Sequence, residues 1–274
     1  MPQRSTTKQS TSQKSKLSVR SCIHLVSGDK GGTGKSAFSS LLVDYFTSKD
    51  IALRAIDGDI TNPTLSMCYP DAVGVVVSDD RDQRNQLNII FLAAQEDSRL
   101  VVVDLPARSE VPISGWLDAY SVIELAKECN IDLVKWWLSD GEPSTIDMFV
   151  ASVKEHPDIP HVFVKNMGLA KPIHWAVLEE NTDIQKWYEE GKIEVTELPW
   201  VHRDLINKVR RARRSFLALS EDKGAMDIMT RGCMSYYLRE GFRALEATQV
   251  IADIAGSAAL SSQKKADPTE TKAS

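Results

Sequence analysis

The chain has 274 residues, 42% of them hydrophobic, which is enough to bury one large core, and we expect a single domain. A net charge of −5 excludes a global basic field for nucleic acid, so any contact with DNA has to come from a local patch. Its four cysteines are far apart, which excludes a disulfide scaffold and a zinc site within the chain, and no apolar run approaches the roughly 18 residues of a membrane span. We therefore expect a cytoplasmic protein.

Three regions are distinguished by composition. Residues 1–19 are rich in Ser, Thr, Gln and Lys without an acidic residue, which predicts a disordered basic arm, and residues 258–274 predict a disordered polar tail. Between them, in 20–257, short apolar runs alternate with amphipathic stretches, which is typical of a doubly wound α/β fold with a mostly parallel sheet and helices on both faces. Strands are predicted near 21–27, 51–56, 99–104, 131–138, 160–166 and 192–197, with a weaker run at 74–78.

A glycine-rich segment follows the first predicted strand. Residues 27–36 read Ser-Gly-Asp-Lys-Gly-Gly-Thr-Gly-Lys-Ser and lead into a helical pattern at 37–47. This is the strand-loop-helix context of a phosphate-binding loop (P-loop), in which backbone N–H groups approach phosphate oxygens, Lys35 meets the β- and γ-phosphates and Ser36 ligates Mg²⁺. The alternative is a plain glycine-rich turn, which the complete motif disfavours. The expected nucleotide contacts are Gly31, Gly32, Thr33, Gly34, Lys35, Ser36 and Ala37.

Carboxylates follow two further strands. Asp57 and Asp59 come after the strand at 51–56, and their position at a strand's carboxyl end suits a metal ion and a water, although an Asp-rich turn is the alternative. Asp104 ends the continuous apolar run 100–104, the pattern of a carboxylate that holds Mg²⁺ through water. The predicted metal set is Ser36, Asp59 and Asp104.

The loop after Asp104 and two later turns complete the predicted site. Arg108 and Glu110 are interpreted either as solvated loop charges or as sensors of the nucleotide or a partner. Asn166 follows the strand at 160–164, and Pro199 closes the last strand. Because the Asn-Lys-x-Asp signature for guanine is absent, the nucleotide is predicted to be ATP.

A basic helix is predicted after Pro199. Its apolar stripe consists of Val201, Leu205, Val209, Ala212 and Phe216. Its other faces carry the densest basic cluster of the chain: Arg203, Lys208, Arg210, Arg211, Arg213 and Arg214. Such a surface predicts salt-dependent, sequence-independent binding to DNA, with a solvated face or a site for an acidic protein as the alternatives. The tail lacks the amphipathic pattern of a membrane anchor, so no membrane contact is expected.

The pattern Lys-Gly-Gly-Thr-Gly-Lys-Ser contains a second lysine, Lys30, and resembles the deviant Walker A ATPases of the ParA/MinD family. The resemblance implies that Lys30 reaches across a nucleotide-sandwich homodimer to the partner's ATP, and that Lys30, Lys35 and Asp57 are catalytic, with Asp57 near the attacking water. It also implies that Asn166 and Pro199 contact adenine. Ala107 stands where the family has glycine in its Asp-x-Pro-Gly segment, which predicts a stiffer switch.

Taken together, motif and resemblance predict a Mg-ATP-dependent, dimerising ATPase with weak, partner-stimulated turnover. Its predicted role is a switch in plasmid or chromosome partition or in cargo positioning, with ATP-gated, non-specific DNA binding and an unidentified adaptor or cargo protein. A cytoplasmic, nucleoid-associated location follows from that role. A MinD-like membrane-positioning ATPase and a metabolic P-loop ligase stay open as alternatives.

Overall fold

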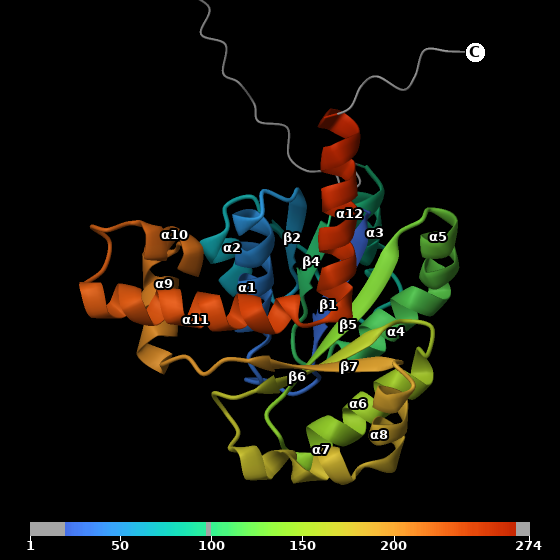
Figure 1. Ribbon diagram of the computed structural model, residues 1–274. Coiled ribbons are helices and arrows are strands. Elements are labelled where there is room, and N and C mark those ends of the chain that lie inside the picture. The colour runs from blue at the N-terminus through green and yellow to red at the C-terminus, as the bar shows by residue number, and fades with distance from the viewer. Residues whose placement is uncertain (1–19, 97–99, 267–274) are drawn as a thin grey trace, which may run out of the picture.

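Seven parallel strands form one sheet in the computed structural model, which describes residues 20–96 and 100–266 and side-chain surroundings as far as residue 257 (Figure 1). Their order is β3-β2-β4-β1-β5-β6-β7. The strands are β1 (Cys22–Ser27), β2 (Leu53–Asp57), β3 (Val73–Gly74), β4 (Leu100–Asp104), β5 (Asp132–Ser139), β6 (His161–Asn166) and β7 (Ile193–Leu198). The predicted doubly wound α/β fold is confirmed.

Helices connect the strands and cover both faces of the sheet (Figure 1). The α-helices are α1 (Lys35–Ser48), α2 (Thr64–Cys68), α3 (Asn88–Glu96), α4 (Glu110–Ala119), α5 (Val122–Glu128), α6 (Pro143–Glu155), α7 (Ala176–Glu180), α8 (Thr182–Glu189), α9 (Arg203–Ala212), α10 (Phe216–Glu221), α11 (Ile228–Glu246) and α12 (Gln249–Ala266). Two 3₁₀ turns, η1 (Arg84–Leu87) and η2 (Pro172–Trp175), precede α3 and α7. No helix in the described part of the chain is both long and apolar enough to cross a membrane.

Alternating side chains of the central strands enter two different cores. In β1, Cys22 and Val26 pack with α1, α2 and α9–α12, whereas Ile23 and Leu25 pack on the opposite face with α3, α4 and α5. A third cluster on that opposite face, around Trp137, joins β5 and β6 to α6–α8. Because both faces are covered, the strands read as continuous apolar runs, as is usual for buried parallel sheets.

Two expectations about element boundaries need correction. The weak run at 74–78, expected to be a strand or a loop edge, contributes only Gly74 to the two-residue strand β3, Val73–Gly74. The range 258–274, expected to be a disordered tail, begins inside a helix, because α12 follows α11 after a break at 247–248 and continues through Ala266. The expected arm, 1–19, and residues 267–274 lie outside the described residues.

Candidate nucleotide-binding site

The loops after β1, β4 and β5 meet at one edge of the sheet. β1 pairs with β4 on one side and with β5 on the other, so Val26 lies beside both Asp104 and Trp136. The chain builds β2–β4 on one side of β1 and β5–β7 on the other, which makes this edge the switch point where open α/β sheets bind ligands. The P-loop therefore lies at the position expected of a ligand site.

Lys35 lies at the centre of the P-loop. Its side chain is buried, and its Nζ donates to the carbonyl oxygens of Gly28, at 2.8 Å, and Lys30, at 2.9 Å. Burial lowers the pKa of this ammonium group, while the carboxylates of Asp104 and Asp29 act in the opposite direction. The loop is thus folded around one positive charge.

Two loop positions require glycine. Gly28 has φ +136°, and a Cβ there would lie 2.6 Å from the carbonyl oxygen of Leu138. Gly34 has φ +102°, and its Cβ would collide with Nδ2 of Asn166. Both positions combine a left-handed backbone with a close approach, so any larger residue would distort the loop.

Asp104 provides an unpaired carboxylate oxygen next to the P-loop. Oδ1 accepts a 3.0 Å hydrogen bond from Ser39, whereas the buried Oδ2 has no partner among the described residues. Burial raises the pKa of Asp104 to about 7, with Asp57 adding to the rise and the hydroxyls of Ser36 and Ser39 opposing it. A buried carboxylate oxygen without a partner is costly, and a hard cation beside Ser36 would satisfy it, so these residues fit Mg²⁺.

Asp57 and Asp59 are placed differently. Asp57 is buried, and its carboxylate accepts the backbone N–H groups of Asp59, at 3.1 Å, and Ser66, at 2.8 Å. Burial raises the pKa of Asp57. Asp59 is partly exposed and bonds the N–H of Asn62 at 3.0 Å. Asp57 therefore orders the turn into α2 through both of its oxygens, in addition to the catalytic role predicted for it.

Lys30 lies at the exposed rim of the loop. Its Nζ forms a 2.6 Å ion pair with Oδ2 of Asp140, the residue directly after β5. The side chains are 44% and 16% exposed respectively, so the lysine is accessible while its partner is largely covered. The hydrogen bond to Asp140 raises the pKa of Lys30. Burial alone would raise the pKa of Asp140, but its hydrogen bonds with Lys30 and with the backbone N–H of Glu142, together with the charge of Lys30, outweigh burial and lower that pKa.

Asn166 and Pro199 lie on the other side of the P-loop, at the ends of β6 and β7. Asn166 Nδ2 donates to the carbonyl oxygen of Thr33 at 2.7 Å, and its Oδ1 accepts the N–H of Gly168 at 2.9 Å. Asn166 pairs with Leu198 in the sheet, so the partly buried Pro199 follows directly beside it. The structure thus brings Asn166 to the loop, and base contact stays a prediction.

The sequence-based interpretation missed the surroundings of Glu110. This side chain is not a solvated loop charge, because its carboxylate accepts hydrogen bonds from the fully buried Nζ of Lys135 at 2.6 and 3.0 Å. Lys135 is the one charged residue inside the apolar run of β5, and that position was the available signal. Asp140 and Ser39 were also missed, because only the fold brings them to Lys30 and Asp104.

The basic cluster is spread over more than one helix. Leu205 and Val209 of the predicted stripe are buried, but α9 ends at Ala212, Arg213 adopts a left-handed conformation with φ +51°, and Phe216 begins α10. Lys208 bonds Thr230 at 2.7 Å, and Arg214 pairs with Asp222 at 2.8 Å. The remaining members are exposed and form no ion pair with another described residue: Arg203, Arg210, Arg211 and Arg213.

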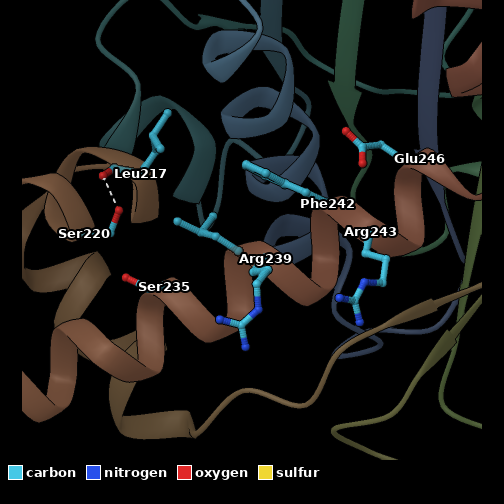
Figure 2. A pocket seen from close by; sticks show the side chains of 8 residues that line it. Leu217, Ser220, Ser235, Arg239, Phe242, Arg243 and Glu246 are labelled. Atoms are coloured by element: carbon cyan, nitrogen blue, oxygen red, sulfur yellow. Dashed lines mark hydrogen bonds between the residues drawn. The ribbon is translucent and has the colours of Figure 1, made fainter.

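A groove lies between α10 and α11 (Figure 2). Leu217 and Phe242 line its apolar part. Figure 2 shows Arg239 and Arg243 extending from the same side of α11, where each also contacts Glu240 at 3.1–3.2 Å. These two arginines were not among the basic residues predicted from the sequence.

Sequence relatives of the chain match only part of it. No protein-family model matches the chain. The chain is 23% identical to Protein MobD of Acidithiobacillus ferrooxidans over 143 residues, which cover 52% of this chain and 60% of MobD. It is 30% identical to a Protein TraL of Escherichia coli over 128 residues, which cover 46% of this chain and 53% of TraL. The chain thus matches little more than half the length of these curated relatives.

Among solved structures, the chain is similar to the septum site-determining protein MinD of Pyrococcus horikoshii OT3, solved with Mg-ADP. The TM-score is 0.50 at 16% identity, covering 85% of this chain and 97% of MinD. This likeness concerns the fold. The two-lysine P-loop is the motif in which the chain resembles the ParA/MinD family.

Proposed function

We propose that this ParA/MinD-like P-loop protein is a Mg-ATP-dependent, dimerising ATPase that acts as a positional switch with ATP-gated, non-specific DNA binding. The observation that carries the proposal is the separation of its two loop lysines. Lys35 is buried at the loop's centre, where a phosphate would replace the two carbonyl oxygens that it now contacts. Lys30 is exposed at the rim and is free to meet a second molecule once it leaves Asp140.

The residues around the loop fit Mg-ATP. The backbone N–H groups of residues 31–36 and Lys35 would hold the phosphates, and Ser36, Asp104 and the more exposed Asp59 would hold the metal ion and its water shell. Asn166 and Pro199 would contact the base. When bound, Mg-ATP supplies the phosphoryl group and the charge that these residues are arranged to hold. MinD of P. horikoshii, which has this fold, was solved with Mg-ADP.

Turnover is proposed to be slow. Asp57 would orient the attacking water, but both of its oxygens already accept backbone N–H groups, so fewer of its lone pairs are left to hold that water. Lys30 from the partner subunit would add a positive charge at the phosphates only after dimerisation. A catalytic set that is complete only in the dimer is consistent with a switch rather than a metabolic enzyme.

DNA binding is proposed for the surface formed by α9–α11. Residues 203–246 contain ten Lys and Arg against six Asp and Glu, a net charge of +4 in a chain whose total is −5. This concentration of positive charge on an otherwise acidic protein favours contacts with the DNA phosphates that do not depend on the base sequence. Cargo release on hydrolysis, through an adaptor or cargo protein, completes the proposed cycle, and the proposed location is cytoplasmic and nucleoid-associated.

The proposed function is tested by measuring DNA binding together with the molecular mass of the protein in solution. We would measure binding to non-specific duplex DNA at two salt concentrations with ATP or ADP, for the natural chain and for Lys30→Ala, together with mass by light scattering. Salt-sensitive binding by an ATP-dependent dimer, lost in the variant, is the expected result. An ATP dimer without DNA affinity would exclude the DNA part, and no ATP dimer would exclude the switch.

Replacing Arg210, Arg211 and Arg214 with Glu localises the DNA surface. This variant should lose DNA binding and keep ATP binding and dimerisation, since the three side chains are exposed and remote from the P-loop contacts. Unchanged DNA affinity would mean that these arginines form a solvated surface that does not bind DNA.

A further inference from the structure

The loop after Asp104 is tied to the P-loop through Asp29. The backbone N–H of Arg108 donates to the carbonyl oxygen of Asp29 at 2.9 Å, and the N–H of Glu110 lies 3.5 Å from Oδ1 of the same residue. Arg108 adopts φ +59°, a conformation that is uncommon for a residue with a side chain. Asp29 stands at the position where the general P-loop pattern has glycine, and glycine would keep the backbone contact with Arg108 but lose the side-chain contact with Glu110.

Asp29 is also enclosed by the contacts of Lys35. The two carbonyl groups that Lys35 bonds belong to Gly28 and Lys30, the neighbours of Asp29 on either side. A phosphate that draws Lys35 away would release both carbonyl groups. The backbone of Asp29, and with it the anchor of Arg108 and Glu110, would then be free to move.

Beyond Glu110, a buried polar network continues to α6. Lys135 Nζ donates to both oxygens of Glu110 and to Ser152 Oγ at 2.9 Å. His161 Nδ1 lies 2.6 Å from the carbonyl oxygen of Ile159, so Nδ1 carries the proton and Nε2 accepts from Ser152 at 3.1 Å. Burial, aided by the charge of Lys135, lowers the pKa of His161 to about 3, which keeps the ring neutral.

A second bridge holds the same two helices together. Ser114, one turn after Glu110 on α4, bonds Nε2 of His156 at 2.9 Å, and His156 directly follows α6. Both groups are buried. The polar face of α4 is therefore connected to α6 at two levels, and a displacement of Glu110 cannot leave α6 unaffected.

We propose that Glu110 and Lys135 are positioning residues that transmit occupancy of the P-loop, through Asp29, to α4 and α6. This inference rests on the nucleotide binding proposed above. A buried ion pair is weak evidence of stabilisation, because an apolar pair of similar volume is often as stable, so its presence at the head of α4 calls for another explanation. The network of hydrogen bonds supplies one, since it makes the loop and two helices move as a unit.

The test removes the pair without leaving a lone charge. In the double variant Glu110→Gln, Lys135→Met, hydrogen exchange is followed with and without Mg-ADP, and ATP turnover is compared with affinity. In the natural chain we expect Mg-ADP to change exchange in residues 143–155. In the double variant that change should be lost and kcat should fall about tenfold, while the Kd for ATP stays within about threefold, the pattern of a lost transition-state interaction.

Control variants distinguish a loss of transmission from the P-loop to α6 from a general loss of protein stability. Lys127→Met with Asp158→Asn removes an exposed 2.9 Å ion pair away from the loop and should change neither readout. If the double variant does not fold, Glu110→Asp can be used, because it keeps both charges and shortens one side chain by a methylene group. It should show the same effects to a smaller degree. A nucleotide-dependent change in α6 that persists in these variants, with normal kcat, would overturn the inference. A natural chain that binds no Mg-ADP would overturn the proposed function first, and this inference with it.

Discussion

The ammonium group of Lys30 lies 2.6 Å from Asp140 Oδ2, so the lysine proposed to act on a partner subunit is held within its own chain. The two groups come from the loops after β1 and β5, strands that are neighbours in the sheet. An ion pair in this position would compete with the proposed dimerisation, because Lys30 would have to leave Asp140 before it could reach a second nucleotide.

Asp140→Asn should therefore favour the ATP dimer. The amide removes the charge that holds Lys30, and the dimer dissociation constant measured with ATP by sedimentation should fall about two- to thirtyfold, because each dimer releases two partly exposed ion pairs of about 0.2–1 kcal/mol each. The effect should shrink at high salt. Lys30→Ala is the matched control and should abolish the dimer in either background. A weaker dimer in Asp140→Asn would contradict the competition.

Asp104→Asn should separate metal binding from folding. The amide keeps an oxygen for Ser39 but removes a buried charge that burial already disfavours, so at pH 8 the protein without nucleotide should be at least as stable in urea. The rise in Tm on adding Mg-ATP should drop to that seen with ATP and a chelator. A variant that retains the full Mg²⁺-dependent rise would exclude Asp104 from the metal site.

Asp44 makes stability depend on pH. This carboxylate of α1 is 1% exposed and accepts the N–H of Leu217 at 3.1 Å, and burial raises its pKa from 3.8 to about 7. Because the folded state holds the proton more tightly, the stability that Asp44 contributes is present below about pH 4 and is lost as the pH rises through about 7.

The comparison with Asp44→Asn tests this dependence. The difference in the free energy of unfolding, natural chain minus Asp44→Asn, should fall between about pH 4 and pH 7 by up to about 4 kcal/mol, the value of a three-unit shift. Asp104 titrates equally in both proteins and cancels. Urea titrations at several pH values measure the difference, and a constant difference would exclude Asp44 as its source.

Each exposed arginine of the basic cluster should contribute one phosphate contact to the salt dependence of DNA binding. Single Ala variants of Arg203 or Arg211 should each reduce the slope of log K against log salt by about 1, since each removes one phosphate contact. Lys186→Ala, an exposed lysine on α8 with a 69% exposed side chain, is the control and should leave the slope unchanged. Equal effects from all three variants would mean that DNA samples the whole protein.

Trp200 offers an optical signal for the base side of the site. It is 57% exposed, and its Cδ1 lies 3.7 Å from where a Cβ on Gly168 would be, next to Asn166. Four of the other five tryptophans are at most 3% exposed, so nucleotide binding near Asn166 should change mainly the emission of Trp200. Trp200→Phe should abolish this change and retain Mg-ATP binding measured by calorimetry. An undiminished change in the variant would place the base elsewhere.

The sequence predicted the strands and the position of the glycine-rich loop between β1 and α1 well, because both depend on local pattern. The apolar runs at β1, β4 and β5 end at the residues that form the site, and glycine spacing defines the loop. The errors came from tertiary contacts. Glu110 reads as a surface charge until Lys135, 25 residues later, is folded against it. The break between α11 and α12 at 247–248 has no Pro or Gly to mark it in the sequence.

The strand order determines when along the chain the site can be assembled. β1 pairs with β4 and with β5. The paired residues are 78 positions apart in the chain for β4, as in Cys22–Leu100, and 110 positions apart for β5, as in Cys22–Asp132. Closing such distant pairs is slow in comparison with forming helices or hairpins. During synthesis, the P-loop leaves the ribosome long before Asp104 and Asp140, so a nascent chain cannot complete the nucleotide site until more than half of it has been made.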